Sequence, residues 1–114
     1  MGQKDRFREG IERSGLYMKE IKSIFKQFNL PEELSILPHV ESSFQIGAYS
    51  SAGAAGIWQF TRGTGRLFMR VGYDVDERRD PILATYGAAK LLKRNFEGGG
   101  SWPLAVTAYN HGLQ

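Results

Sequence analysis

Residues 80–100, DPILATYGAAKLLKRNFEGGG, contain the signals for both ends of one helix. Asp80 offers a side-chain acceptor to the first helical N–H groups, and Pro81 fits the first helical position, where a backbone N–H is not needed. The glycines at 98–100 predict the end of this helix. Between the two signals the apolar residues recur at helical spacing: Ile82, Leu83, Tyr86, Leu91 and Phe96.

The segment that precedes this helix in the chain gives further helical signals. Apolar residues recur at steps of three, four or seven from residue 7 to residue 28, and Gly15 is expected to divide this stretch. Asn29 and Pro31 predict a stop and a new start. The short helix that follows is expected to carry Leu34, Leu37, Val40 and Glu41, and to be bent or brief because of Pro38.

The remaining segments complete a helical domain. Residues 45–56 have the glycine, serine and alanine content of an ordered loop, and residues 58–69 are predicted to be helical, with Thr61 or Thr64 as the cap. A last helix is expected from residues 101–103 to Gly112. No long alternating pattern indicates a strand. The predicted fold class is therefore all-α, with five or six short helices in a single domain over residues 1–114.

Composition and charge exclude several classes of protein. The chain is 41% hydrophobic with a net charge of +3, which is typical of a folded globular domain, and it has no apolar run long enough for a membrane span. Residues 29–60 contain no Lys or Arg, which argues against nucleic-acid binding. The absence of cysteine excludes disulfides and thiolate sites but leaves the compartment open.

The common catalytic motifs are also missing. The sequence has no phosphate-binding P-loop, no H-E-x-x-H and no G-x-S-x-G, and its two histidines, His39 and His111, are far apart. We therefore expect neither a metal ion nor another cofactor. This leaves the carboxylates as candidate catalytic groups.

Glu41 stands apart from the other acidic residues. It lies among Leu37, Val40 and Phe44, and no Lys or Arg follows it within about twenty residues. A carboxyl group that loses hydration without gaining an ion pair has a raised pKa, which suits a general acid. The alternative, an exposed glutamate at a helix end, remains open on this local argument.

Three motifs together resemble a known family. They are Glu41-Ser42, the segment GAAGIWQ at residues 53–59, and Ala108-Tyr109-Asn110. In this order and spacing they resemble the lytic transglycosylases with a Slt-type, lysozyme-like catalytic domain, and most closely the membrane-bound lytic murein transglycosylase D branch. The resemblance covers most of the chain, from about Tyr17 to Gly112, and implies a lysozyme-like helical fold.

The resemblance implies cleavage of the β-1,4 bond between N-acetylmuramic acid and N-acetylglucosamine in peptidoglycan, with a 1,6-anhydromuramoyl end as product. Glu41 matches the single catalytic acid and base of that family, and the substrate's acetamido group replaces the second carboxylate that most glycosidases need. Two alternatives remain open. One is a goose-type muramidase that hydrolyses the same bond, and the other is a non-catalytic peptidoglycan-binding module.

The same resemblance implies roles for further residues, each with a structural alternative. Ser42 and Ser50 are expected near the acid and the sugar, or as local caps, and Gln59 is expected to bind the N-acetyl group or to support its loop. Tyr109 is expected to direct its hydroxyl at the acid or to be a core residue, and Asn110 to bind substrate or to end the last helix. The aromatic residues Phe44, Trp58 and Phe60 are candidates for sugar stacking but more commonly belong to a core. Gly53 and Gly56 are expected to allow a close approach of the glycan.

The family also implies a setting for the domain. The expected partner is a peptidoglycan glycan strand, in the periplasm or cell envelope of a bacterium. Domains of this family usually continue beyond the position of Gln114, so the segment is expected to be a catalytic domain cut from a longer protein and shortened at its C-terminal end. The oligomeric state is left open.

Overall fold

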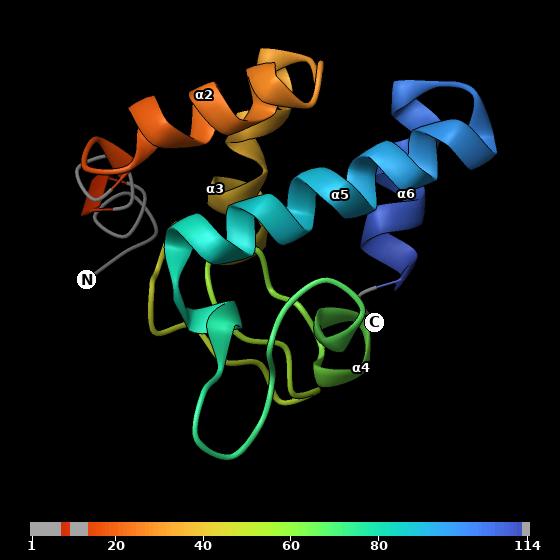
Figure 1. The fold of residues 1–114 in the computed structure, drawn as a ribbon. Helices are drawn as coiled ribbons and strands as arrows, with labels where there is room; N and C mark the ends of the chain where they lie inside the picture. Colours follow the sequence, from red (N-terminus) through yellow and green to blue (C-terminus); the bar gives the residue numbers. More distant parts are fainter. Residues whose placement is uncertain (1–7, 10–13, 113–114) are drawn as a thin grey trace.

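A computed structural model describes residues 8–9 and 14–112, and the side chains of residues 110–112 lie outside this description. It confirms the all-α class, because the described residues form helices and only isolated β-bridges (Figure 1). The helices with described bounds are α2 (Met18–Gln27), η1 (Glu32–Ile36), α3 (Leu37–Ser42), α4 (Arg62–Arg66), η2 (Glu77–Arg79), α5 (Pro81–Gly99) and α6 (Trp102–Gly112), where η marks a 3₁₀ helix.

Helix α5 forms the centre of the fold and has the predicted ends. The Asp80 carboxylate accepts hydrogen bonds from the backbone N–H groups of Ile82 and Leu83, both at 2.9 Å. Gly100 ends the helix in a left-handed conformation, with a φ of +79°. Helix α2 and helix α6 both pack against α5, and the segment from residue 43 to residue 79 lies on the side of α5 opposite α2 in Figure 1. The core between these elements is formed by buried residues that include Ile21, Ile24, Phe25, Ala84, Ala88 and Leu92.

The chain leading to Glu41 contains two helix starts, one for η1 and one for α3. Asn29 is left-handed, with a φ of +56°, and Pro31 precedes the 3₁₀ helix η1. Pro38 lies in the first turn of α3, where its missing N–H costs nothing, so it begins a short helix instead of bending a long one. Helix α3 ends at Ser42 and is followed by Ser43, which caps it with a φ of +51°. The predicted break near Gly15 is also present as a turn, whereas Phe7 and Ile11 lie outside the described residues.

The prediction of a helix over residues 58–69 is wrong, because only Arg62–Arg66 are helical. Ala55 and Phe60 exchange two backbone hydrogen bonds, at 2.9 and 3.2 Å, and Gln59 adopts a φ of +54°. These features turn the chain back on itself and prevent a helix from starting at Trp58. The predicted cap at Thr61 is correct, since its hydroxyl accepts the N–H of Thr64 at 3.3 Å. The predicted loop over residues 45–56 is confirmed.

Candidate active site

Glu41 lies near the C-terminal end of α3 and lines a cavity of about 280 Å³. The cavity is formed by the end of α3 and by the loop that follows it. Among the described residues that line it, Glu41 is the one acidic residue, and none is a Lys or Arg. The other lining residues are Val40, Ser42, Ser43, Gln45, Ala48, Tyr49, Ser50 and Gln59.

The surroundings of Glu41 raise the pKa of its carboxyl group above the ordinary value of 4.5, and the cause is desolvation by burial. Among the ion pairs that the structure gives for its described residues, none involves Glu41. The predicted direction of this pKa shift is therefore confirmed. A carboxyl group of this kind holds its proton closer to neutral pH, as a general acid must.

Ser42 and Ser50 line the cavity beside Glu41, and both also hold the loop in place. The Ser42 hydroxyl lies 2.8 Å from the carbonyl oxygen of Ile57 and 3.0 Å from that of Pro38, so it donates to either. The Ser50 hydroxyl oxygen accepts the N–H of Ala54 at 3.0 Å. The contact with Ile57 joins the helix that carries the acid to the glycine-containing segment.

Gln59 reaches the same cavity from a tight turn. Its side-chain amide donates to the carbonyl oxygen of Gly56 at 2.8 Å, which stabilises the left-handed backbone of Gln59 itself. The structure therefore brings Glu41, Ser42, Ser50 and Gln59 together around one cavity. Contact of the last three with a substrate stays a prediction.

Tyr109 is fully buried and belongs to α6. Its hydroxyl donates to the carbonyl oxygen of Trp58 at 2.8 Å, and its ring packs edge-on against Trp58 and Phe60. Burial raises the pKa of the Tyr109 hydroxyl, and the negative charge of Glu41 raises it further. Tyr109 is thus within electrostatic reach of the acid, while its hydrogen bond goes to the loop. Asn110 follows it in α6, but its side chain lies outside the described residues.

Burial decides between the two readings of the aromatic residues, and the contacts of one glycine require a correction. Phe44, Trp58 and Phe60 have no exposed surface, so they belong to the core, as was expected to be more common for such residues, and they are not available for sugar stacking. Gly56 has a φ of +81°, and a Cβ atom there would lie 1.8 Å from the carbonyl oxygen of Arg78. The absence of a side chain at Gly56 therefore allows the backbone of Arg78 to pack against it, and not a glycan.

The sequence analysis did not identify Arg78, which binds the backbone of the loop beside the cavity. Arg78 is buried, and its Nη1 donates to the carbonyl oxygens of Gly53 at 2.9 Å and Phe60 at 3.0 Å. Its other nitrogens bind both carboxylate oxygens of Asp76, at 2.8 and 2.7 Å, and this hydrogen bonding lowers the pKa of Asp76. In the sequence Arg78 belongs to a polar connector between helices. No local pattern indicates that its partners Phe60 and Gly53 lie 18 and 25 positions away.

Metal and membrane features are absent from the part of the chain that the structure describes. Within residues 8–9 and 14–112, no group of three or more His, Cys, Asp or Glu is arranged to hold a metal ion. Within the same residues, no helix has the length and apolar character needed to cross a membrane.

Comparison with known proteins gives consistent matches. The family model for the transglycosylase SLT domain matches residues 19–114. Membrane-bound lytic murein transglycosylase D from two strains of Escherichia coli is 43% identical over 98 residues, which cover 84% of this chain but only 22% of the relative. A protein of Alteromonas sp. named for tributyltin chloride resistance is 33% identical over 100 residues, covering 84% of this chain and 47% of that relative.

Proposed function

Because the chain belongs to the transglycosylase SLT domain family, we propose that it is a peptidoglycan lytic transglycosylase with Glu41 as its single catalytic acid and base. The bond cleaved is the β-1,4 linkage between N-acetylmuramic acid and N-acetylglucosamine. The observation that carries the proposal is the Glu41 carboxyl group, which has a raised pKa and lies in a cavity whose described lining contains no second acidic residue. The name of the Escherichia coli relatives supports the same reaction class.

The proposed reaction uses one carboxyl group twice. Glu41 first gives its proton to the glycosidic oxygen, which leaves with the bonding electrons as the hydroxyl group of the departing sugar. The substrate's own acetamido oxygen relieves the positive charge at the anomeric carbon, so no second carboxylate is needed. The ionised Glu41 then takes the proton of the C6 hydroxyl as that oxygen closes the 1,6-anhydro ring. The proton returned to Glu41 restores the enzyme, and no water is consumed.

The remaining site residues have supporting roles in this proposal. Ser42, Ser50 and Gln59 present polar groups to the cavity, and Gln59 is proposed to bind the N-acetyl group. Tyr109 is proposed to position the acid through the loop, because its hydroxyl bonds to the carbonyl group adjacent to Gln59. Asn110 is proposed as a further substrate contact. The partner would be a peptidoglycan glycan strand, and the location the bacterial periplasm or cell envelope.

The test is the chemical form of the product. Purified peptidoglycan is digested with the protein, and the soluble fragments are analysed by mass spectrometry. The proposal predicts fragments with 1,6-anhydromuramoyl ends. Fragments heavier by one water molecule would show hydrolysis of the muramidase type, and intact peptidoglycan would favour a binding module. Either result would contradict the proposed reaction.

A further inference from the structure

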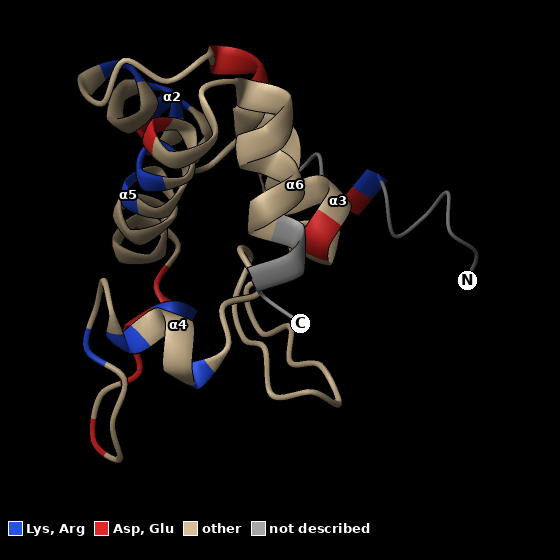
Figure 2. Ribbon diagram, turned by 90° about the vertical axis from the view of Figure 1, so that its right-hand side faces the viewer, with Lys and Arg blue, Asp and Glu red and all other residues tan. Residues whose placement is uncertain are grey.

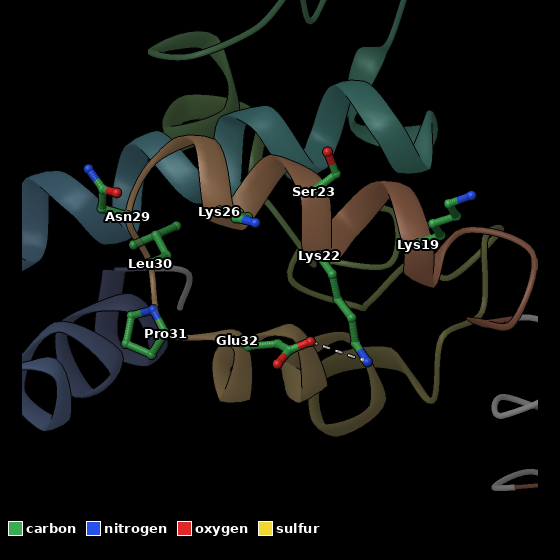
Figure 3. A pocket seen from close by; sticks show the side chains of 8 residues that line it. All are labelled: Lys19, Lys22, Ser23, Lys26, Asn29, Leu30, Pro31 and Glu32. Carbon is green, nitrogen blue, oxygen red and sulfur yellow. Dashed lines mark ion pairs between the residues drawn. The ribbon is translucent and has the colours of Figure 1, made fainter.

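A second and larger hollow lies on another part of the surface. It has a volume of about 900 Å³ and lies between α2 and the turn that follows it (Figure 3). Lys19, Lys22 and Lys26 reach it from α2, at positions i, i+3 and i+7, which share one face of a helix. Its other lining residues are Ser23, Asn29, Leu30, Pro31 and Glu32, none of which lines the Glu41 cavity. We refer to this hollow as the lysine groove.

The lysine groove carries an excess of positive charge. Glu32 is the one acidic residue in its lining, and it pairs with Lys22 at 3.5 Å, as Figure 3 shows. Both side chains are largely exposed, so this pair is weak and an incoming anion can compete for Lys22. The structure gives Lys19 and Lys26 no ion pair within its described residues. Two exposed ammonium groups are therefore available to a ligand.

The Glu41 cavity has the opposite character, because no Lys or Arg is among the described residues that line it. The described Lys and Arg lie on α2, α4, η2 and α5 and at Arg8 and Arg70 (Figure 2). A peptidoglycan strand bears peptides whose carboxylates need a cationic partner, and the described residues of the Glu41 cavity offer none. Glu32 in the groove and Glu41 in the cavity lie on the consecutive helices η1 and α3. Helical rises over this stretch limit their Cα separation to at most roughly 18 Å, a distance that a polymer can bridge.

We propose that the lysine groove binds the carboxylates of the peptidoglycan stem peptides while the glycan strand occupies the Glu41 cavity. This inference rests on the proposed function, because it takes its ligand from the same polymer. The concave form of the groove and its polar Ser23 and Asn29 suit a peptide. A flat lipid surface would not enter a hollow, and a single-stranded nucleic acid would be expected to stack on aromatic residues, none of which is among the described lining residues.

The test compares binding to two forms of insoluble peptidoglycan by co-sedimentation. One form is native, and in the other the peptide carboxyl groups have been converted to amides with a carbodiimide and ammonia. The unmodified protein should bind the native form about tenfold more tightly, and added salt should reduce that preference. The variant K19Q/K22Q/K26Q should lose it. The control R62Q/K90Q/R94Q removes the same charge from exposed residues outside the groove and should keep the preference within about twofold.

A further variant tests the groove in the opposite direction. Glu32→Gln releases Lys22 and removes the one negative charge of the lining, so it should strengthen binding to native peptidoglycan about twofold. Equal binding of the unmodified protein to both forms of peptidoglycan would overturn the inference. So would equal losses in the groove and control variants, or a lysine-dependent preference for anionic phospholipid vesicles or DNA over peptidoglycan.

Co-sedimentation does not require cleavage, which separates this inference from the proposed function. If the protein binds through the groove lysines but forms no anhydro product, the inference about the groove stands and the proposed reaction is wrong. If it forms the anhydro product but its binding does not depend on these lysines, only the inference about the groove is wrong.

Discussion

At Glu41 the requirements of acid catalysis oppose those of stability. Burial raises the pKa of this carboxyl group above 4.5, so the folded chain holds the proton more tightly than the unfolded chain does. Stability should therefore decrease as the pH rises from the unfolded pKa through the folded one. Above that range the partly buried carboxylate is ionised, and its lost hydration lowers the free energy of unfolding.

The first prediction follows from this decrease of stability with rising pH. Glu41→Gln removes the charge with little change in shape, so the melting temperature at pH 7 should rise by about 1–3 °C. The gain should vanish below about pH 4, where the carboxyl group is protonated in both states. Thermal melts of both proteins from pH 3 to pH 8 measure it. A variant that is less stable than the parent at pH 7 would show that the ionised carboxylate has a favourable partner.

Tyr109 is the second residue whose role can be tested. Its hydroxyl is buried and donates to the Trp58 carbonyl, so Tyr109→Phe leaves that oxygen without its partner. We expect a loss of about 1–2 kcal/mol in the free energy of unfolding. We also expect turnover to fall on the order of tenfold, because the Trp58–Gln59 backbone shifts beside the cavity.

Denaturant unfolding and steady-state digestion of peptidoglycan measure both effects of the Tyr109 substitution. Tyr86→Phe is a suitable control, since Tyr86 packs against Phe28 and is not part of the cavity. A Tyr109 variant with unchanged turnover would leave this residue with a packing role alone.

Among the structural elements, the loop from residue 43 to residue 60 builds the cavity although it contains no helix. Three side chains hold it through hydrogen bonds to its backbone carbonyl oxygens. Ser42 donates to Ile57, Tyr109 donates to Trp58, and Arg78 donates to Gly53 and Phe60. Each anchor comes from a different helix or turn. The position of Gln59 and Ser50 relative to Glu41 is therefore set by contacts between distant segments.

Arg78→Lys tests the largest of these anchors. Lysine cannot make the paired hydrogen bonds of a guanidinium group, so two or more of the bonds to Asp76, Gly53 and Phe60 are lost. We expect a loss of about 2–4 kcal/mol in stability. Hydrogen exchange at the Ala55 and Phe60 amides should accelerate more than exchange in α5.

Arg79→Lys is the matched control for this anchor. Arg79 is 56% exposed and lies 3.8 Å from Asp76, so its replacement should cost less than about 1 kcal/mol. Equal effects of the two substitutions on stability and on exchange in the loop would show that the buried guanidinium does not hold the loop.

The sequence predicts the elements that end in local signals and fails for those fixed at long range. Asp80, Pro81 and Gly100 mark α5 because capping involves neighbours along the chain. The turn at Gln59 depends on the bridge between Ala55 and Phe60 and on Arg78, which no helical periodicity reveals. For the same reason the raised pKa of Glu41 could be predicted from its apolar neighbours, whereas the bond between Tyr109 and Trp58 could not.

Considered as a whole, the molecule places its cations and its candidate acid in different regions. Of the residues that the structure describes, no Lys or Arg lines the cavity around Glu41, whereas three lysines line the lysine groove. The described residues also contain no cluster of side chains suited to a metal ion. In the proposed reaction, catalysis depends on the carboxyl group of Glu41 and on the substrate's own acetamido group.

Chelation tests this expectation for the whole protein. Activity on purified peptidoglycan should remain within about twofold after dialysis against EDTA, because the proposed reaction needs no Lewis acid. The rate of release of soluble fragments before and after dialysis is the measurement. A loss of activity that returns with added Zn²⁺ or Mg²⁺ would contradict the proposed chemistry.

The most direct measurement of the central claim is the turnover of Glu41→Gln on purified peptidoglycan, beside a control with the same chemical change at the exposed Glu33. The amide cannot give and retrieve a proton, so turnover should fall by at least about 10² to 10⁴, while Glu33→Gln should keep the rate of the parent. Circular dichroism and thermal melts establish that both variants are folded. A folded Glu41→Gln protein that retains more than about a tenth of the parent's turnover would contradict the assignment of Glu41 as the catalytic acid.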